Sequence, residues 1–355
     1  PPFFQAEDGI RDVLLSLVGS EMCIRDRYGP TMDHAGYRGH RSRMKAESVA
    51  QVRESQEYER AVRGVDIRAV QTTRAEGHTT VSTTSAGRVD ATRVSVGIPF
   101  MSSSVINGDA LVVSFVIAKG SVWCGDEIET GDVLIHGPEA LHTASNPVGF
   151  AVTFAVVPVQ EVGVASSSLG SGVDHLTGRF VRLPPGAATS RLGLTVAGAF
   201  GDTPKDQLFA PPPLEFLPSA VADAIDASYG DPHRTTGARI NDAAIVTACI
   251  ERAEAIGRVP GVAEMRLAAH VSERRLRRAF VHEYGVPPAR FFRRWALDRA
   301  RRHLLDQGDD FTSVTRGALD LGFRHLGRFA AYYRSQFGEL PSATLARSTG
   351  RAPLG

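Results

Sequence analysis

The stretches VAEMRLAAHVSERRLRRAF, residues 262–280, and TSVTRGALDLGFRHLGRFAAYY, residues 312–333, decide the fold of the C-terminal part of this chain. Each predicts two short helices separated by a tight turn. The first stretch breaks at His270-Val271, after which Ser272 can cap the next helix, and the second breaks at Gly322-Phe323. The two stretches therefore predict a helix-turn-helix unit that occurs twice.

The second helix of the first unit has one apolar face and one basic face. Leu276, Ala279 and Phe280 share the apolar face at helical spacing, and Arg274 and Arg278 centre the opposite one. Two exposed arginines one turn apart suit the major groove of DNA, because a guanidinium can form two hydrogen bonds with O6 and N7 of guanine. For an isolated helix, a solvated basic face is the alternative interpretation.

A longer helix is expected between the two units. Residues 289–305, ARFFRRWALDRARRHLL, carry an apolar stripe at helical spacing, made of Phe292, Ala296, Ala300 and Leu304. We interpret it as a rigid connecting helix. Two units held by one such helix could place both recognition helices in successive major grooves, about 34 Å apart.

This region resembles the AraC/XylS family of bacterial transcription regulators over roughly residues 243–346. The residues that carry the resemblance are Ser272-x-Arg274-x-Leu276-x-Arg278-x-Phe280, Tyr284-Gly285-Val286-Pro287-Pro288, Trp295-Ala296-Leu297-x-x-Ala300-Arg301-x-x-Leu304, Ala318-x-x-x-Gly322-Phe323, His325-Leu326-Gly327-Arg328-Phe329 and Phe337-Gly338-Glu339-x-Pro341-Ser342. The resemblance implies DNA-binding control of transcription, usually activation, switched by a small molecule on an N-terminal domain. It also implies RNA polymerase as a partner and allows a homodimer.

The distribution of charge supports a nucleic-acid partner independently. The whole chain has 40 basic and 39 acidic residues, a net charge of +1 that suggests no strongly charged partner. Residues 241–348, however, contain 18 arginines, no lysine and 12 acidic residues, so this part carries +6 and the remainder −5. The positive charge is concentrated where phosphates would bind.

The two units are expected to differ in what they contact. When Leu276 is superposed on Phe329, the first unit's arginines align with Gly327, Ala330 and Ala331, whose side chains cannot hydrogen-bond a base. The first unit would then read sequence, and the second would mainly contact phosphate, with Ala331 at most touching a thymine methyl. The expected DNA-binding residues are Ser272, Arg274, Arg275, Arg277, Arg278, Arg324, His325, Arg328 and Arg334.

Two further positions depart from the family pattern. Arg266 stands where the family usually has a small buried residue, which leaves the local register of the first helix open. Gly317 takes a position usually held by a branched apolar residue, at a cost to the helix of about 1 kcal/mol.

The N-terminal half is rich in strands. Residues 88–96, 110–118, 132–136 and 150–157 are rich in Val, Ile, Thr and Phe and are separated by glycine turns. This spacing predicts an antiparallel sandwich or barrel. The expected fold class is therefore α+β and multidomain, with an antiparallel, cupin-like β-barrel sensor domain followed by an all-α domain of two helix-turn-helix units.

The N-terminal half is not expected to be an enzyme or a metal site. The fragment Gly131-x6-Pro138-x3-His142-x3-Asn146 is similar to the second cupin motif, but residues 88–129 contain no histidine for the usual HxH ligand pair. His136 and His142 are interpreted as barrel or loop histidines. Common nucleophile and phosphate-binding motifs are absent as well.

We therefore expect a metal-free pocket, without a cofactor, for an effector whose contacts the sequence does not identify. Two alternatives stay open. One is a cupin-like enzyme with a DNA-binding appendage, and the other is a DNA-binding protein that senses no ligand.

The predicted organisation has five parts. Residues 1–27 resemble a translated sequencing adapter and are left out of the fold argument, and residues 28–165 form the sensor domain. Residues 166–241 hold a linker and possible dimerisation helices, with 214–228 read equally well as a core helix. Residues 242–348 form the DNA-binding domain and 349–355 a tail. Three separated cysteines and apolar runs far shorter than the roughly 20 residues of a membrane span predict a cytoplasmic protein without membrane contact.

Overall fold

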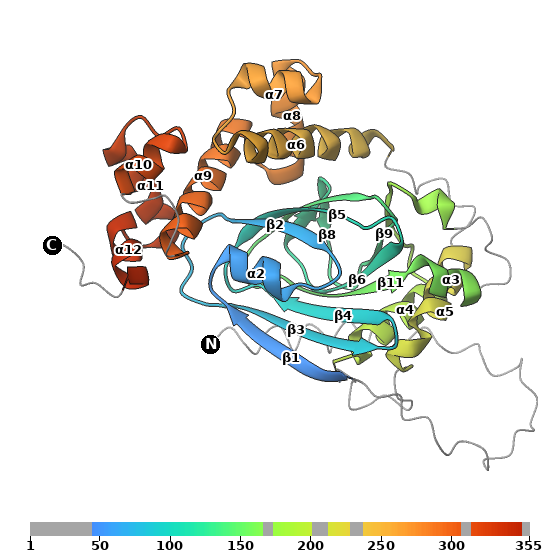
Figure 1. Cartoon of the computed structure of the whole chain (residues 1–355). Helices are drawn as coiled ribbons and strands as arrows, with labels where there is room; N and C mark the ends of the chain where they lie inside the picture. Colours follow the sequence, from blue (N-terminus) through green and yellow to red (C-terminus); the bar gives the residue numbers. More distant parts are fainter. Residues whose placement is uncertain (1–44, 166–172, 201–211, 228–236, 307–313, 350–355) are drawn as a thin grey trace, which may run out of the picture.

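The computed structural model describes residues 45–165, 173–200, 212–227, 237–306 and 314–349. Strands form an N-terminal domain, and a group of helices lies against one side of it and forms the C-terminal domain (Figure 1). The adapter-like residues 1–27 lie outside the described residues. Within those residues, no helix is both long enough and apolar enough to cross a membrane.

The N-terminal domain contains two antiparallel sheets, as the sequence predicts. The larger has the strand order β1 (Lys45–Val52), β3 (Thr79–Ala86), β4 (Val89–Ser95), β11 (Ala151–Pro158), β6 (Ala110–Ala118), β9 (Val133–His136) and β12 (Phe180–Arg182). The smaller has the order β2 (Asp66–Gln71), β5 (Phe100–Val105), β10 (Leu141–Asn146), β7 (Ser121–Trp123) and β8 (Asp126–Ile128). The four strands predicted from composition are β4, β6, β9 and β11, each within about one residue of its predicted bounds.

Strand β6 shows why the larger sheet is apolar on both faces. Alternate residues along a strand point to opposite sides of the sheet. Val112 and Val116 face a core between the two sheets, whereas Leu111, Val113, Phe115 and Ile117 belong to a second core under a layer of helices. An uninterrupted apolar run is therefore what this central strand requires.

The helices on the outer face of the larger sheet are α3 (Val159–Ala165), α4 (Ala187–Gly198) and α5 (Leu217–Ala227), whereas α2 (Ser55–Ala61) precedes β2 (Figure 1). Leu217, Val221 and Ile225 of α5 are buried in the core that these helices share with the sheet. Pro218 is the second residue of α5, where proline is tolerated. The packing thus supports the core interpretation of residues 214–228.

The C-terminal domain consists of α6 (Gly237–Ile256), α7 (Val262–Ala269), α8 (Glu273–Tyr284), α9 (Pro288–Leu305), α10 (Val314–Asp320), α11 (Leu326–Phe337) and α12 (Pro341–Thr349). The two predicted helix-turn-helix units are α7–α8 and α10–α11, and the predicted connecting helix is α9. Helix α6 begins inside residues 166–241, the segment expected to hold a linker and possible dimerisation helices. Residues 228–236, just before α6, lie outside the described ranges.

The turn of the first unit has the expected chemistry. His270 ends α7 in the left-handed region, with φ of 53°, and the Ser272 hydroxyl accepts a hydrogen bond from the Arg275 amide at 3.3 Å. Gly285 ends α8 with φ of 69°, a conformation that costs glycine little. The helix bounds therefore follow from caps that are visible in the sequence.

Both units pack on the buried stripe of α9. Phe292, Ala296, Ala300 and Leu304 are all buried in one core with Leu276, Phe280, Phe329 and Tyr333. The register of α7 is settled by Met265, which takes the buried position while Arg266 is exposed. Gly317 is buried in the short helix α10.

Candidate nucleic-acid interface and internal cavity

Most of the predicted DNA-binding side chains are free to meet a ligand. Exposed to solvent are Ser272, Arg274, Arg277, Arg278, Arg324, His325, Arg328 and Arg334. Arg275 differs, because its side chain is only 24% exposed and forms an ion pair with Asp242 of α6. Of the nine residues, Arg275 is thus the one whose guanidinium is already used inside the domain.

Helix α8 presents the two faces that its sequence predicts. Its buried side holds Leu276, Ala279 and Phe280. The exposed side holds Arg274 and Arg278, and Val281 continues it with 45% exposure. Helix α8 therefore has one apolar face packed in the core and one basic face that could enter a groove of DNA.

Helix α11 presents a different surface. His325 is its N-cap residue and makes no capping hydrogen bond through its side chain. The exposed part includes Ala331 and Tyr332, and the Arg293 guanidinium lies 4.5 Å from the Tyr332 ring centroid. Sequence reasoning missed Tyr332, because an aromatic residue next to the buried Tyr333 reads as core.

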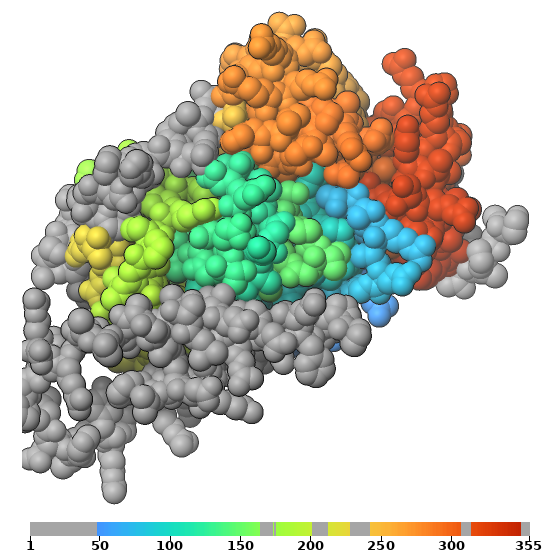
Figure 2. All heavy atoms as spheres, turned by 180° about the vertical axis from the view of Figure 1, so that it is seen from behind, coloured from blue at the N-terminus to red at the C-terminus, as the bar shows by residue number. Residues whose placement is uncertain are grey.

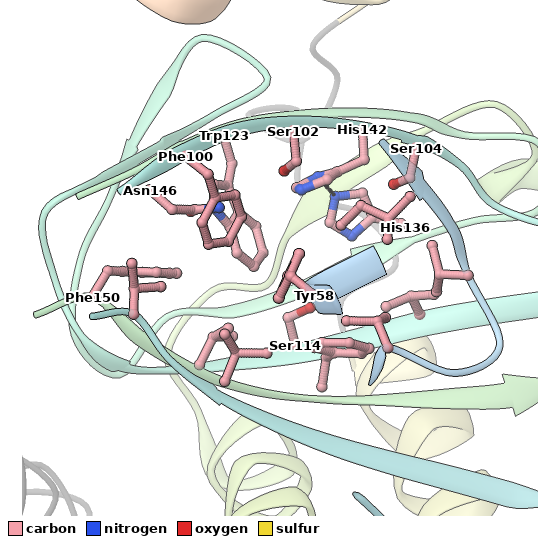
Figure 3. Close-up of a pocket in the computed structure, with 18 of the residues that line it drawn as sticks. Tyr58, Phe100, Ser102, Ser104, Ser114, Trp123, His136, His142, Asn146 and Phe150 are labelled. Carbon is pink, nitrogen blue, oxygen red and sulfur yellow. Dashed lines mark hydrogen bonds between the residues drawn. The ribbon is translucent and has the colours of Figure 1, made fainter. Parts of the chain in front are cut away.

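The N-terminal domain has a cavity between its two sheets (Figure 3). Most of its wall is apolar and includes Val94, Val112, Phe100 and Phe150. The polar side chains that line it are Tyr58, Ser102, Ser104, Ser114, Trp123, His136, His142 and Asn146. A partly apolar molecule with a few hydrogen-bonding groups would match this wall.

Two histidines face each other in the cavity wall. His142 Nδ1 and His136 Nε2 are 2.8 Å apart and share one hydrogen bond (Figure 3). Burial lowers the pKa of His142 to about 4, and burial, together with His142, lowers the pKa of His136 well below its usual value. Both imidazoles are therefore neutral at neutral pH.

Trp123 has a fixed place beside them. Its indole N–H donates to Asn146 Oδ1 at 3.1 Å, and its ring lies edge-on to His142 with centroids 4.8 Å apart. The Ser121 hydroxyl donates to the same Asn146 oxygen at 2.6 Å. The amide oxygen of Asn146 thus already has two donors from the protein.

The wall formed by β5 and β10 also contacts the recognition helix α8, which lies directly against this side of the strand domain (Figure 2). Ser102 and His142 line the cavity. The Tyr284 hydroxyl donates to the Ser102 carbonyl at 3.0 Å, and the Thr143 hydroxyl donates to the Glu283 carboxylate. One pair of strands therefore faces the cavity on one side and α8 on the other.

Burial affects both α8 side chains in this contact. It raises the pKa of Tyr284, so the hydroxyl stays protonated and can donate. It also raises the pKa of Glu283, against the opposing effects of the Thr143 hydrogen bond and of His282.

A second contact joins α9 to α2 and its N-cap residue Glu54. Arg301 binds Glu54 through two hydrogen bonds of 2.6 and 2.7 Å, and Arg302 binds Glu59 at 2.6 and 2.8 Å. The Ser55 hydroxyl donates to Asp298 at 2.7 Å. Burial raises the pKa of Asp298, although the neighbouring Arg302 opposes this effect. Bidentate arginine–carboxylate pairs hold both side chains in a fixed relative orientation and also pair their charges.

Residues 267–347 match the family described as a helix-turn-helix domain. The XylDLEGF operon transcriptional activator of Pseudomonas putida is 47% identical over 77 residues, which are 22% of this chain and 24% of that protein. The XylDLEGF operon transcriptional activator 2 of the same organism is 39% identical over 103 residues, 28% of this chain and 66% of that protein.

A solved structure described as a probable AraC family transcriptional regulator from Rhodopseudomonas palustris CGA009 is 33% identical. The match covers 31% of this chain and 98% of that one, with a TM-score of 0.28. The similarity to the first activator spans about a quarter of that protein's length.

Proposed function

The C-terminal domain of this chain belongs to the AraC/XylS family of helix-turn-helix regulators, and on this premise we propose that the protein is a sequence-specific DNA-binding transcription regulator. The observation that carries the proposal is the exposed basic face of α8, centred on Arg274 and Arg278 and backed by a buried core. The second helix-turn-helix unit, α10–α11, packs on α9 and would bind an adjacent major groove of the same double-stranded DNA.

The two units would make different contacts with DNA. Arg274, Arg277 and Arg278 are long donors that can reach base edges from α8. The corresponding side of α11 offers Ala331 and Tyr332, while its exposed arginines suit phosphates. Arg275 would act mainly by fixing α8 to α6 through its ion pair with Asp242.

The cavity is the proposed effector site. A molecule bound against Ser102 or His142 would shift strands that also hold Tyr284 and Glu283 of α8. A ligand can change DNA affinity only through different interactions in the two states, and this shared wall supplies a route for them. The apolar lining favours a small, partly apolar effector.

The other functional expectations are also proposals. We infer activation rather than repression, contact with RNA polymerase, a cytoplasmic location and the possibility of a homodimer. The two Pseudomonas putida proteins compared above are described as transcriptional activators, and we propose no catalytic activity for this chain.

Selection of bound duplexes from a random double-stranded pool tests DNA binding directly. Wild-type protein should enrich one sequence, and the double variant Arg274→Ala/Arg278→Ala should enrich none while keeping its thermal unfolding midpoint. The control is Arg88→Ala, which removes an arginine side chain that is 64% exposed and pairs with Glu161 of the N-terminal domain. Enrichment of the same sequence by the double variant would contradict the proposal.

A further inference from the structure

Three potential metal ligands lie close together, and two of them, His136 and His142, line the cavity. Cys124 is in the turn between β7 and β8, His136 ends β9, and His142 is in β10. One ligand atom from each lies within 4.8 Å of the other two, and His136 and Cys124 are 2% and 6% exposed. The cluster is separate from the arginine surface and from the interdomain ion pairs.

The spacing is close to what a tetrahedral metal ion requires. A zinc ion with a Zn–S bond of about 2.3 Å and Zn–N bonds of about 2.0–2.1 Å holds its ligand atoms about 3.3–3.6 Å apart. The two imidazole nitrogens start 2.8 Å apart, so small side-chain rotations would open the required space.

We propose that Cys124, His136 and His142 bind a divalent transition-metal ion of the zinc type, as one thiolate and two imidazoles. The Cys124 thiol loses its proton to solvent when the metal–sulfur bond forms. Both histidines also line the cavity, so a water molecule or a donor atom of a cavity-bound molecule can complete the coordination (Figure 3). This ligand set differs from that of cupins, because it has a thiolate and lacks the HxH pair.

A second group of potential ligands fits a metal ion less well. Asp242, His282 and Glu283 also lie within 4.8 Å of one another. Asp242 is already paired with Arg275, and Glu283 accepts from Thr143. A cation there would face the positive charge of Arg275, so the Cys124 cluster is the better candidate.

The test is zinc binding by the full-length protein after removal of metal with a chelator. All proteins carry Cys23→Ser, so that Cys23, which lies outside the described residues, cannot supply a thiolate to the metal. We expect one tightly bound Zn²⁺ per chain, an affinity at least about 100-fold lower in Cys124→Ser, and no change in Cys249→Ser. Cys249 is the matched control, since it is buried in the helical domain, where its thiol contacts the Met265 carbonyl.

Two further measurements separate loss of the site from loss of the fold. Thermal unfolding in excess chelator should give Cys124→Ser and wild type the same midpoint, and Zn²⁺ should raise only that of wild type. Co²⁺ should give a thiolate-to-metal charge-transfer band that His142→Gln weakens and Cys124→Ser abolishes. None of these readouts involves DNA, so they are independent of the proposed regulatory function.

Three results would overturn the metal site. The first is unchanged zinc affinity in Cys124→Ser, and the second is a cobalt complex without a thiolate band. The third is loss of binding in Asp242→Asn but not in Cys124→Ser, which would assign the metal to the other cluster.

Discussion

Arg301 and Arg347 both bind Glu339, but they differ in burial. Arg301 is 10% exposed at its side chain and also binds Glu54, whereas the side chain of Arg347 is 52% exposed. Arg301→Met should lower the free energy of unfolding by about 3 kcal/mol, because the partly buried Glu54 carboxylate loses its arginine and Glu339 loses one of its two. Arg347→Met should cost about 0–1 kcal/mol. Urea unfolding measures both, and equal losses would contradict the argument.

Arg278 and Arg334 test the division of labour between the two units. On the duplex selected by wild-type protein, Arg278→Ala should lose about 1–3 kcal/mol of discrimination against a scrambled duplex. Arg334→Ala should weaken binding to both duplexes alike, since a phosphate contact carries no direct sequence information. Titrations of each variant with both duplexes decide the matter. Equal loss of discrimination in the two variants would refute the division.

For single residues, helical spacing predicts which side chains are exposed, but it does not predict which of them form ion pairs. Eight of the nine predicted DNA-binding side chains are exposed, because the opposite face of each helix is apolar. The partner of Arg275 is Asp242, on a different helix and 33 positions earlier in the chain. No local pattern connects two such positions.

Ser272 joins helix stability and DNA binding at the element scale. Ser272→Ala removes the cap of α8 and should destabilise the protein by about 1 kcal/mol. Ser272→Asp should keep the cap and the thermal midpoint but weaken DNA binding, because it adds negative charge next to the arginine face. Thermal unfolding and duplex titration of both variants separate the two roles. A stable Asp variant with normal affinity would remove Ser272 from the interface.

Local sequence predicts the ends of the elements better than their packing partners. Ser272 and Gly285 mark the ends of α8 because their conformational preferences act within one turn. The same kind of pattern left α5 open between a core helix and a dimer helix. The core that it shares with the larger sheet favours the first, and that contact depends on residues 100 positions away.

The uneven charge of the whole molecule predicts a strong salt dependence of DNA binding. The logarithm of the binding constant should fall linearly with the logarithm of salt concentration, by about 0.9 per neutralised phosphate. Arg334→Ala should reduce the magnitude of this slope by about 0.9. Arg88→Ala, in the N-terminal domain, should leave this slope unchanged. A slope near zero for wild type would exclude an interface dominated by phosphate contacts.

The contact between the two domains appears only at the scale of the molecule. Thr143 and Glu283 are 140 positions apart, and Arg301 and Glu54 are 247 apart. The contact between Thr143 and Glu283 places α8 on the outer side of the cavity wall. Composition could predict a strand-rich domain, but it could not predict that β5 and β10 face both the cavity and α8.

The sequence by itself determined the two helix-turn-helix units, the connecting helix and the antiparallel strands, because periodicity, caps and turns act over a few residues. Only the tertiary structure decided that Arg275 pairs internally, that α5 belongs to the core, and that Cys124 meets His136 and His142. Those outcomes depend on long-range strand pairing and helix packing, which bring together side chains that the chain keeps far apart.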